Sequence, residues 1–194
     1  MTDPWDRPPF PIKGALIDDE IYLAMGHALS AWEEYEVDLS WLYAVLTERP
    51  VHSEAAYQDY VANADNFIQR ATKLETAGCR YFCRRPNQPD EADFIEILRT
   101  GRGWSLRRND IAHSVVRPAP RVYDATSGMT FENWLKLPEE YLLYPPEYAA
   151  KKFGTYGRPA YAYGFAELSH FAQVFRENGY QVNALTLRLR RRRA

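Results

Sequence analysis

Residues 107–115 read RRNDIAHSV and place a permanent cation, a polar amide and a titratable ring close together. Arg108 stays protonated and can hold a phosphate through its forked guanidinium, but it cannot act as a base. His113 titrates near neutral pH and can take or give a proton. The two side chains therefore have the chemistry to cleave RNA without a metal, by in-line attack of the ribose 2′-hydroxyl.

Helical geometry constrains how these residues could share one phosphate. In a regular helix Asn109 and His113 lie on one side, whereas Arg108 points about 140° away from His113. Either the helix is irregular here, as Gly101 and Gly103 would allow, or the groups complement those of a second protomer. Because the reaction needs two proton transfers, two chains with one histidine each would be more effective.

A carboxylate on an earlier helix is expected to support this site. Glu36 lies beside the apolar seam of the first predicted helix, where a lone charge is costly. We expect Glu36 to pair with Arg108 and to position its guanidinium. The alternatives are that Glu33 is the partner, or that Glu36 is an exposed helix residue.

Apolar spacing predicts the helices that must position these side chains. The first begins at a cap, Asp18 or Asp19, and ends before Pro50. Its seam consists of Ile21, Met25, Ala28, Trp32, Tyr35, Leu39, Leu42 and Leu46. A second helix, with Ser53 as its cap, carries Tyr60, Ala64, Phe67, Ala71, Leu74, Gly78 and Tyr81.

The second half of the chain is less regular. A third helix begins near Asp90, carries Phe94, Ile95, Ile97 and Leu98, and weakens at the two glycines before the motif. Residues 121–123 and 129–131 predict a short hairpin around Ser127-Gly128, followed by an irregular aromatic loop. A fourth helix starts near Tyr163 and uses Phe165, Leu168, Ala172 and Phe175. It either pauses at Asn178-Gly179 or continues through Val182, Leu185 and Leu189.

These elements predict an all-α fold, a four- to five-helix up-and-down bundle with an irregular β-hairpin insertion before the last helix. Prolines make residues 1–16 an extended arm. Residues 17–190 form a single helical domain with the insertion at 115–160, and residues 188–194 form a basic tail.

Composition limits the function classes. The 194 residues carry a net charge of −2, so the chain is not a basic nucleic-acid wrapper. Locally basic segments remain, and we expect Arg102, Arg190 and Arg191 to contact RNA. No signal peptide is recognisable and no apolar run reaches about 20 residues, which predicts a cytoplasmic protein without a membrane segment. Cys79 and Cys83 are expected to be buried free thiols.

The segment Arg108-Asn109-Asp110-Ile111-Ala112-His113 resembles the Arg-polar-X3-His motif of the HEPN superfamily, the higher eukaryotes and prokaryotes nucleotide-binding domains. The run AWEEYEVDLSWL is similar to the Trp- and Glu-bearing first helix of many members. The order of three helices, motif, irregular segment and final helix also resembles their bundle. The resemblance covers most of residues 17–190, although the segment 115–160 is longer than the minimal core of the family.

The resemblance implies a homodimer whose motifs face each other, and a metal-independent endoribonuclease that leaves a cyclic phosphate. Arg108 would bind the phosphate, His113 would act as acid or base, and Asn109 would orient the site, with Asp110 and Arg107 in support. No cofactor is expected. A toxin or defence setting, with an antitoxin or nucleotidyltransferase partner, follows by analogy. Because many such domains are not catalytic, a helical interaction module and a nucleotide-binding partner protein remain alternatives.

One rival constellation involves iron. Asp110-X2-His113 and Glu167-X2-His170 both have the carboxylate-X2-His spacing of di-iron bundles. The positive charge of Arg108 beside the metals argues against that interpretation, so we expect no metal.

Overall fold

The computed structural model describes residues 3–119, 132, 137–148 and 159–192. In this part of the chain the helices are α1 (Asp18–Leu46), α2 (Glu54–Val61), α3 (Phe67–Arg84), α4 (Gln88–Ala112) and α6 (Phe165–Arg191). Strands β1 (Val115–Pro118) and β2 (Tyr141–Tyr144) form an antiparallel pair before α6. The expected all-α bundle with a hairpin insertion before its last helix is confirmed.

Helix α1 follows the predicted seam. Seven of its eight positions are buried, and Met25 is partly buried against the same core. The predicted cap is wrong, because Ile17 is the N-cap residue and makes no side-chain capping bond. Asp18 and Asp19 instead lie in the first turn, where their charges favour the positive end of the helix dipole.

The second predicted helix is in fact two. Ser53 caps α2 as expected, because its hydroxyl accepts a hydrogen bond from the amide of Ala56. The chain then leaves helical geometry at residues 62–66, where Asn63 has a φ of 56°. Asn66 and Gln69 form a capping box that starts α3. Local capping therefore ends one helix and begins another despite continuous apolar spacing.

Helix α4 runs unbroken through both glycines, so the predicted irregularity before the motif is absent. The glycines serve close packing instead. A Cβ on Gly101 would lie 2.3 Å from the hydroxyl of Tyr35, and one on Gly103 would lie 2.1 Å from the ring of Trp5. The motif is therefore presented at the end of a regular helix.

The β-hairpin joins the ends of the fold. β1 pairs with one edge of β2 in the register Val115 with Tyr144, and isolated bridges add Ala15 and Tyr163 to the opposite edge of β2. The strands predicted at 121–123 and 129–131 lie outside the described residues. The observed pairing ties the N-terminal arm to the start of α6.

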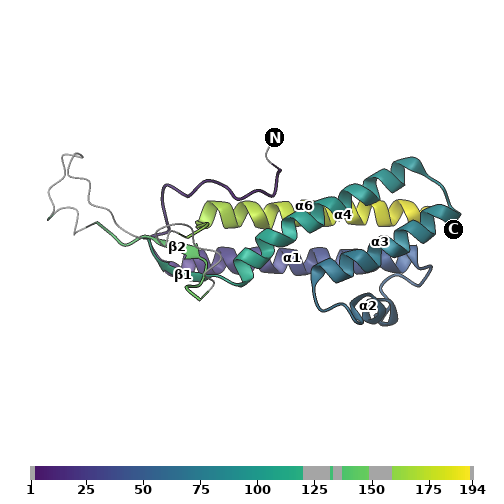
Figure 1. Ribbon diagram of the computed structural model, residues 1–194, viewed down its shortest axis with the longest axis horizontal. Coiled ribbons are helices and arrows are strands. Elements are labelled where there is room, and N and C mark those ends of the chain that lie inside the picture. Colours follow the sequence, from purple (N-terminus) through teal and green to yellow (C-terminus); the bar gives the residue numbers. More distant parts are fainter. Residues whose placement is uncertain (1–2, 120–131, 133–136, 149–158, 193–194) are drawn as a thin grey trace.

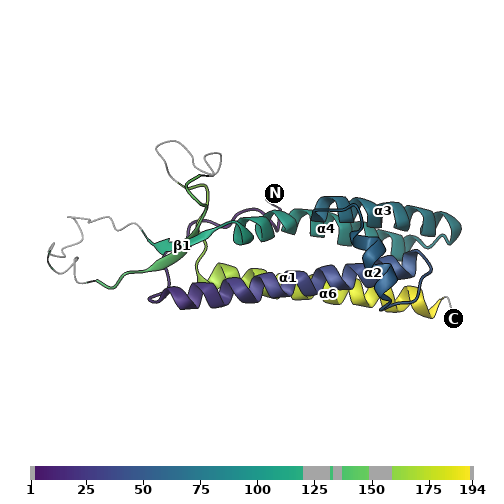
Figure 2. The same ribbon diagram turned by 90° about the horizontal axis from the view of Figure 1, so that it is seen from below.

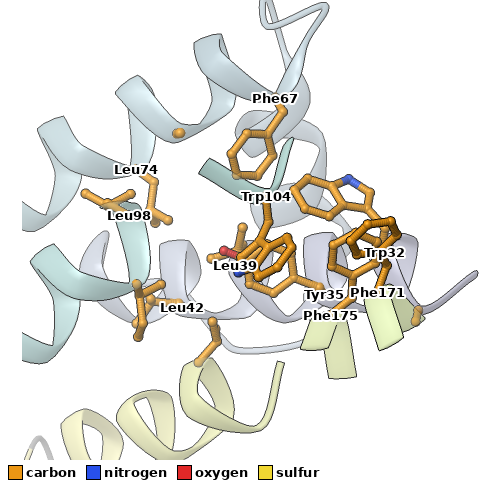
Figure 3. Close-up of a cluster of buried hydrophobic side chains, with 14 of the residues drawn as sticks. Trp32, Tyr35, Leu39, Leu42, Phe67, Leu74, Leu98, Trp104, Phe171 and Phe175 are labelled. Atoms are coloured by element: carbon orange, nitrogen blue, oxygen red, sulfur yellow. The ribbon is translucent and has the colours of Figure 1, made fainter. Parts of the chain in front are cut away.

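Figures 1 and 2 show α1 and α6 lying side by side and running in the same direction. Helix α3 runs with them and α4 runs back, carrying the chain towards the hairpin. Aromatic rings fill the space between the helices: Trp32 makes edge contacts with Tyr35, Phe67 and Phe175 (Figure 3). The core thus joins α1, α3 and α6 directly behind the motif.

Helix α6 continues through Asn178 and Gly179 to Arg191 without a pause. Two predicted core positions are wrong, because Phe165 is 50% exposed and Ile95 is 58% exposed. Both lie on outer faces of their helices. None of the described helices is both long enough and apolar enough to cross a bilayer.

Candidate functional site: the last two turns of α4

The motif divides into an inner and an outer set. Arg107 and Asp110 are buried, Arg108 is partly buried, and Asn109 is exposed. His113 is the exposed C-cap residue, just beyond the last helical residue. The helix therefore directs Arg107 and Asp110 into the protein and leaves Arg108, Asn109 and His113 for chemistry at the surface.

Arg108, Asn109 and His113 line one open pocket of about 640 Å³, here called the motif pocket. Ser105 of α4, Glu36 of α1 and residues 65–70 at the start of α3 complete its walls. A single chain thus brings the three proposed catalytic residues to one cavity, although α4 is regular up to Ala112. His113 reaches the pocket from its non-helical position at the helix end, with φ −113° and ψ 31°.

The guanidinium of Arg108 is only loosely held. One nitrogen donates to Oε1 of Glu33 at 3.2 Å, and another donates to Oδ1 of Asn109 at 3.3 Å. Its Nε is buried and has no hydrogen-bond partner within the described residues. Because Glu33 is well exposed, this ion pair is weak and an incoming phosphate can displace it.

The predicted pairing of Glu36 with Arg108 is wrong. Glu36 is 8% exposed and accepts two hydrogen bonds from Arg70 of α3, at 2.6 and 3.0 Å. The indole of Trp32 donates a third at 2.8 Å, and Arg70 also donates to the carbonyl of Ala64. Glu36 therefore shapes the wall of the motif pocket by joining α1 to α3, and the alternative partner Glu33 holds Arg108.

The His113 side chain is accessible at the surface. It makes no hydrogen bond or ion pair with any described residue. The backbone amide of His113 donates to the carbonyl of Asn109 at 3.2 Å, and this hydrogen bond fixes the position of the His113 backbone from which the side chain extends. No other histidine lines the motif pocket among the residues described.

Asp110 faces the opposite way and holds the fold. Its two oxygens accept hydrogen bonds from Nε and Nη2 of Arg7, both at 3.1 Å, and Arg107 lies 3.4 Å away. The hydroxyl of Tyr163 donates to Oδ2 at 3.0 Å. Burial, and secondly the charge of Asp110, raise the pKa of Tyr163, so this tyrosine remains a donor. Asp110 and Arg107 support the site from behind and do not reach the motif pocket.

The residues expected to bind RNA lie elsewhere. Arg102 donates to Glu75 at 2.6 Å, and this hydrogen bond lowers the pKa of Glu75. Arg190 and Arg191 are exposed at the end of α6. Their neighbour Arg192 pairs with Asp90 at 2.7 Å. Because Asp90 is in the first turn of α4, the basic tail lies about 35 Å along that helix from His113.

Two further expectations can be compared with the structure. Cys79 and Cys83 are free but exposed, so the prediction of buried thiols is wrong. Among the described residues, no group of three or more His, Cys, Asp or Glu side chains is arranged to hold a metal ion. The di-iron constellation is therefore not assembled in this part of the chain.

The sequence interpretation missed Arg70. Its contribution depends on Glu36, 34 residues earlier on another helix. Its only local signal is its place one turn after the Asn66 cap, and that does not identify a partner.

The fold and this pocket define the chain as a helical bundle with an Arg-Asn-X3-His surface site. Comparison with known proteins adds no relative: no protein-family model matches the sequence, nor does any curated protein or solved structure.

Proposed function

We propose that this chain is a metal-independent endoribonuclease of the HEPN type. The observation that carries the proposal is that Arg108, Asn109 and His113 line one open pocket in which no described residue bonds to the His113 ring. The pocket offers a phosphate the guanidinium of Arg108, whose contact with Glu33 is easily displaced, and it also contains a group that can carry a proton, His113. Both are requirements of phosphodiester cleavage by a neighbouring hydroxyl.

The reaction transfers no electrons and needs no co-reactant. A base removes the proton of the ribose 2′-hydroxyl, and its oxygen attacks phosphorus. The bond between phosphorus and the 5′-oxygen then breaks, and an acid donates a proton to that leaving oxygen. The products are a 2′,3′-cyclic phosphate and a 5′-hydroxyl. Arg108 would stabilise the extra negative charge on the pentacoordinate phosphorus.

A homodimer supplies the second proton carrier in this proposal. One described chain brings a single histidine to the motif pocket, whereas the reaction needs both a base and an acid. Two chains whose motif pockets face each other would provide one histidine for each transfer. Sedimentation of the purified protein would test this, because a monomer that cleaves RNA would remove the need for the second chain.

The test of the function is cleavage of mixed RNA in the presence of EDTA. We expect wild type to produce cyclic phosphate ends, and His113→Ala and Arg108→Ala each to lose at least a hundredfold in rate. His113→Ala should keep wild-type stability within about 0.5 kcal/mol because His113 is exposed, and Arg108→Ala, which loses a partly buried side chain and a weak ion pair, should cost no more than about 1 kcal/mol. Activity that survives both substitutions would contradict the proposal.

A second candidate is a non-catalytic interaction module. An open, mainly apolar pocket of about 660 Å³ lies where the N-terminal arm meets α3 and α4, with Trp5, Phe94 and Leu98 among its walls. Apolar concave surfaces are common binding sites for partners. Cleavage that is absent in wild type, together with a partner displaced by Ile95→Glu, an exposed residue of the same pocket, would favour this function. A cytoplasmic toxin or defence role rests on the family resemblance.

A further inference from the structure

A second pocket, here called the basic pocket, lies between α1 and α3 and has a volume of about 380 Å³. Its walls include three cationic side chains, Lys73, Arg80 and Arg84, and one carboxylate, Glu48. It shares no lining residue with the motif pocket. None of its cations belongs to the Arg-Asn-X3-His motif or to the basic tail.

The three cations share one face of α3. Positions 73, 80 and 84 are seven and four residues apart, so their side chains project within one narrow arc of the helix. Lys73 is held by Asp59, to whose carboxylate it lies at 3.3 Å. Arg80 and Arg84 are exposed and form no hydrogen bond or ion pair with any described residue.

The carboxylates around the basic pocket already have partners. Asp59 accepts a hydrogen bond from the hydroxyl of Tyr43 at 2.7 Å and pairs with Arg49 at 3.0 Å, in addition to Lys73. Glu48 pairs with Arg85. The pocket and its rim thus carry five cationic side chains against two carboxylates, and the charges of Arg80 and Arg84 remain for a ligand.

We propose that the basic pocket binds a backbone phosphate of an RNA strand and anchors the strand away from the cleavage position. The proposal rests on the proposed function in taking RNA as the polyanion. Two arginines whose forks bond to no acceptor in the described part of the chain match phosphate oxygens. The aromatic rings of Tyr43 and Tyr81 are buried, so no exposed ring on these walls can stack on a base. The contact should therefore not depend on base sequence.

The distance between the two pockets determines how long an RNA must be to contact both of them. Arg70 borders the motif pocket, and Arg84 lies 14 residues further along α3. This separation corresponds to about 21 Å of helix. A mononucleotide cannot span it, whereas an RNA of about 12 nucleotides, a usual length for single-strand sites, can.

The experiment measures RNA binding with His113→Ala as the parent, so that the RNA stays intact. We expect Arg80→Gln/Arg84→Gln to reduce the slope of log affinity against log salt by about 1.4, the value for two lost contacts to a single strand. If the plots of log affinity against log salt for the parent and the double variant meet at 1 M salt, the two affinities differ about 25-fold at 0.1 M salt. The loss should be equal for RNAs of different sequence.

Arg176→Gln is the matched control, because Arg176 is an exposed arginine of α6 that lines neither pocket. It should leave affinity and slope unchanged. An equal loss in the control, or no loss in the double variant, would overturn the anchor and leave cleavage by His113 standing. If wild type binds RNA through Arg80 and Arg84 but never cleaves it, the anchor holds and the nuclease proposal fails.

Free phosphate is the other source of the same chemistry. Inorganic phosphate and a mononucleotide are therefore titrated into the parent and into the double variant. We expect both to bind far more weakly than the 12-nucleotide RNA. Binding of free phosphate as tight as that of RNA, with the same dependence on Arg80 and Arg84, would overturn the assignment to an RNA strand.

Discussion

Arg7 of the N-terminal arm binds both carboxylate oxygens of Asp110 in the motif helix, with two hydrogen bonds of 3.1 Å. The same guanidinium lies 4.5 Å from the ring centre of Tyr161. Trp5 packs against Gly103, and Arg99 stacks over its indole ring at 4.7 Å. The arm is therefore attached to the inner side of the helix whose outer side carries the candidate site.

Replacing Arg7 with alanine should loosen this attachment. We expect Arg7→Ala to lower the free energy of unfolding by about 1–2 kcal/mol, because Asp110 keeps Arg107 and Tyr163 as partners and Arg7 is partly exposed. Denaturant unfolding measures the change. Arg117→Ala, which removes an exposed pair with Glu147, should cost less than about 1 kcal/mol. Equal effects of the two variants would show that the arm contributes no special stability.

The two glutamates of α1 should respond differently to the same substitution. Glu36→Gln removes the charge that Arg70 and Trp32 share in a buried setting, so we expect a loss of about 2–3 kcal/mol. Glu33→Gln removes an exposed pair and should change stability by less than about 1 kcal/mol. If Glu33→Gln proved the more damaging change, the assignment of partners would be wrong.

Activity should distinguish the same two variants. Glu33→Gln frees the Arg108 guanidinium for phosphate, so the KM for RNA should stay the same or fall, without a loss of kcat. Glu36→Gln should impair cleavage only to the extent that it disturbs the pocket wall. Steady-state kinetics on one RNA measure both effects, and a large loss of kcat in Glu33→Gln would assign that carboxylate a direct role.

The two close-packed glycines of α4 offer a test of the arm. A Cβ on Gly101 would meet Tyr35 and Phe67 in the core, and we expect Gly101→Ala to cost about 1–3 kcal/mol. The three atoms nearest to a Cβ on Gly103 all belong to Trp5 of the arm, while alanine favours the helix by about 1 kcal/mol. Gly103→Ala should therefore preserve overall stability but speed trypsin cleavage in the arm. Unchanged digestion would mean that Trp5 does not hold the arm.

The pair formed by Tyr43 and Asp59 predicts a dependence on pH. The hydrogen bond from Tyr43, followed by that from Lys73, lowers the pKa of Asp59. A lowered folded pKa gives stability that is present above the ordinary carboxyl pKa and is lost as pH falls through the folded value. The stability difference between wild type and Asp59→Asn should therefore shrink from pH 6 to pH 3.

At alkaline pH the pKa of Tyr43 is shifted in the opposite direction from that of Asp59. Burial, and then the hydrogen bond to Asp59, raise its pKa to about 12. Its contribution is present below the ordinary tyrosine pKa of about 10 and is lost as pH rises towards the folded value. Tyr43→Phe should remove the loss of stability that ionisation of Tyr43 causes at high pH. It should also raise the pKa of Asp59, which NMR can measure. An Asp59 pKa unchanged by Tyr43→Phe would contradict the assigned cause.

Regular features of the sequence predicted the regular part of the fold. The seam from Ile21 to Leu46 identified α1 and its buried face, and Ser53 identified the start of α2. Apolar periodicity continued across residues 62–66, although the chain turns there. Apolar spacing alone does not distinguish one helix from two here. The Asn66 capping box starts a second helix whose buried positions continue the spacing of the first.

The candidate site was predicted in its residues but not in its partners. Spacing alone placed Asn109 and His113 on one face and Arg108 on another. It could not show that Glu36 faces α3 and binds Arg70, because this contact depends on how two helices pack. From sequence alone, Gly101 and Gly103 predict a weak point in the helix. Their neighbours Tyr35 and Trp5, distant in sequence, explain why the helix needs them.

The side-by-side, parallel arrangement of α1 and α6 has a consequence for how the protein is made. These helices come from opposite ends of the sequence, yet Trp32 and Phe175 meet in the core. A growing chain cannot complete this core until α6 has left the ribosome. Because the contact between α1 and α6 is non-local, folding of this core is delayed until α6 has been synthesised. A chain that stops before α6 would expose the aromatic face of α1 and be a target for chaperones and proteases.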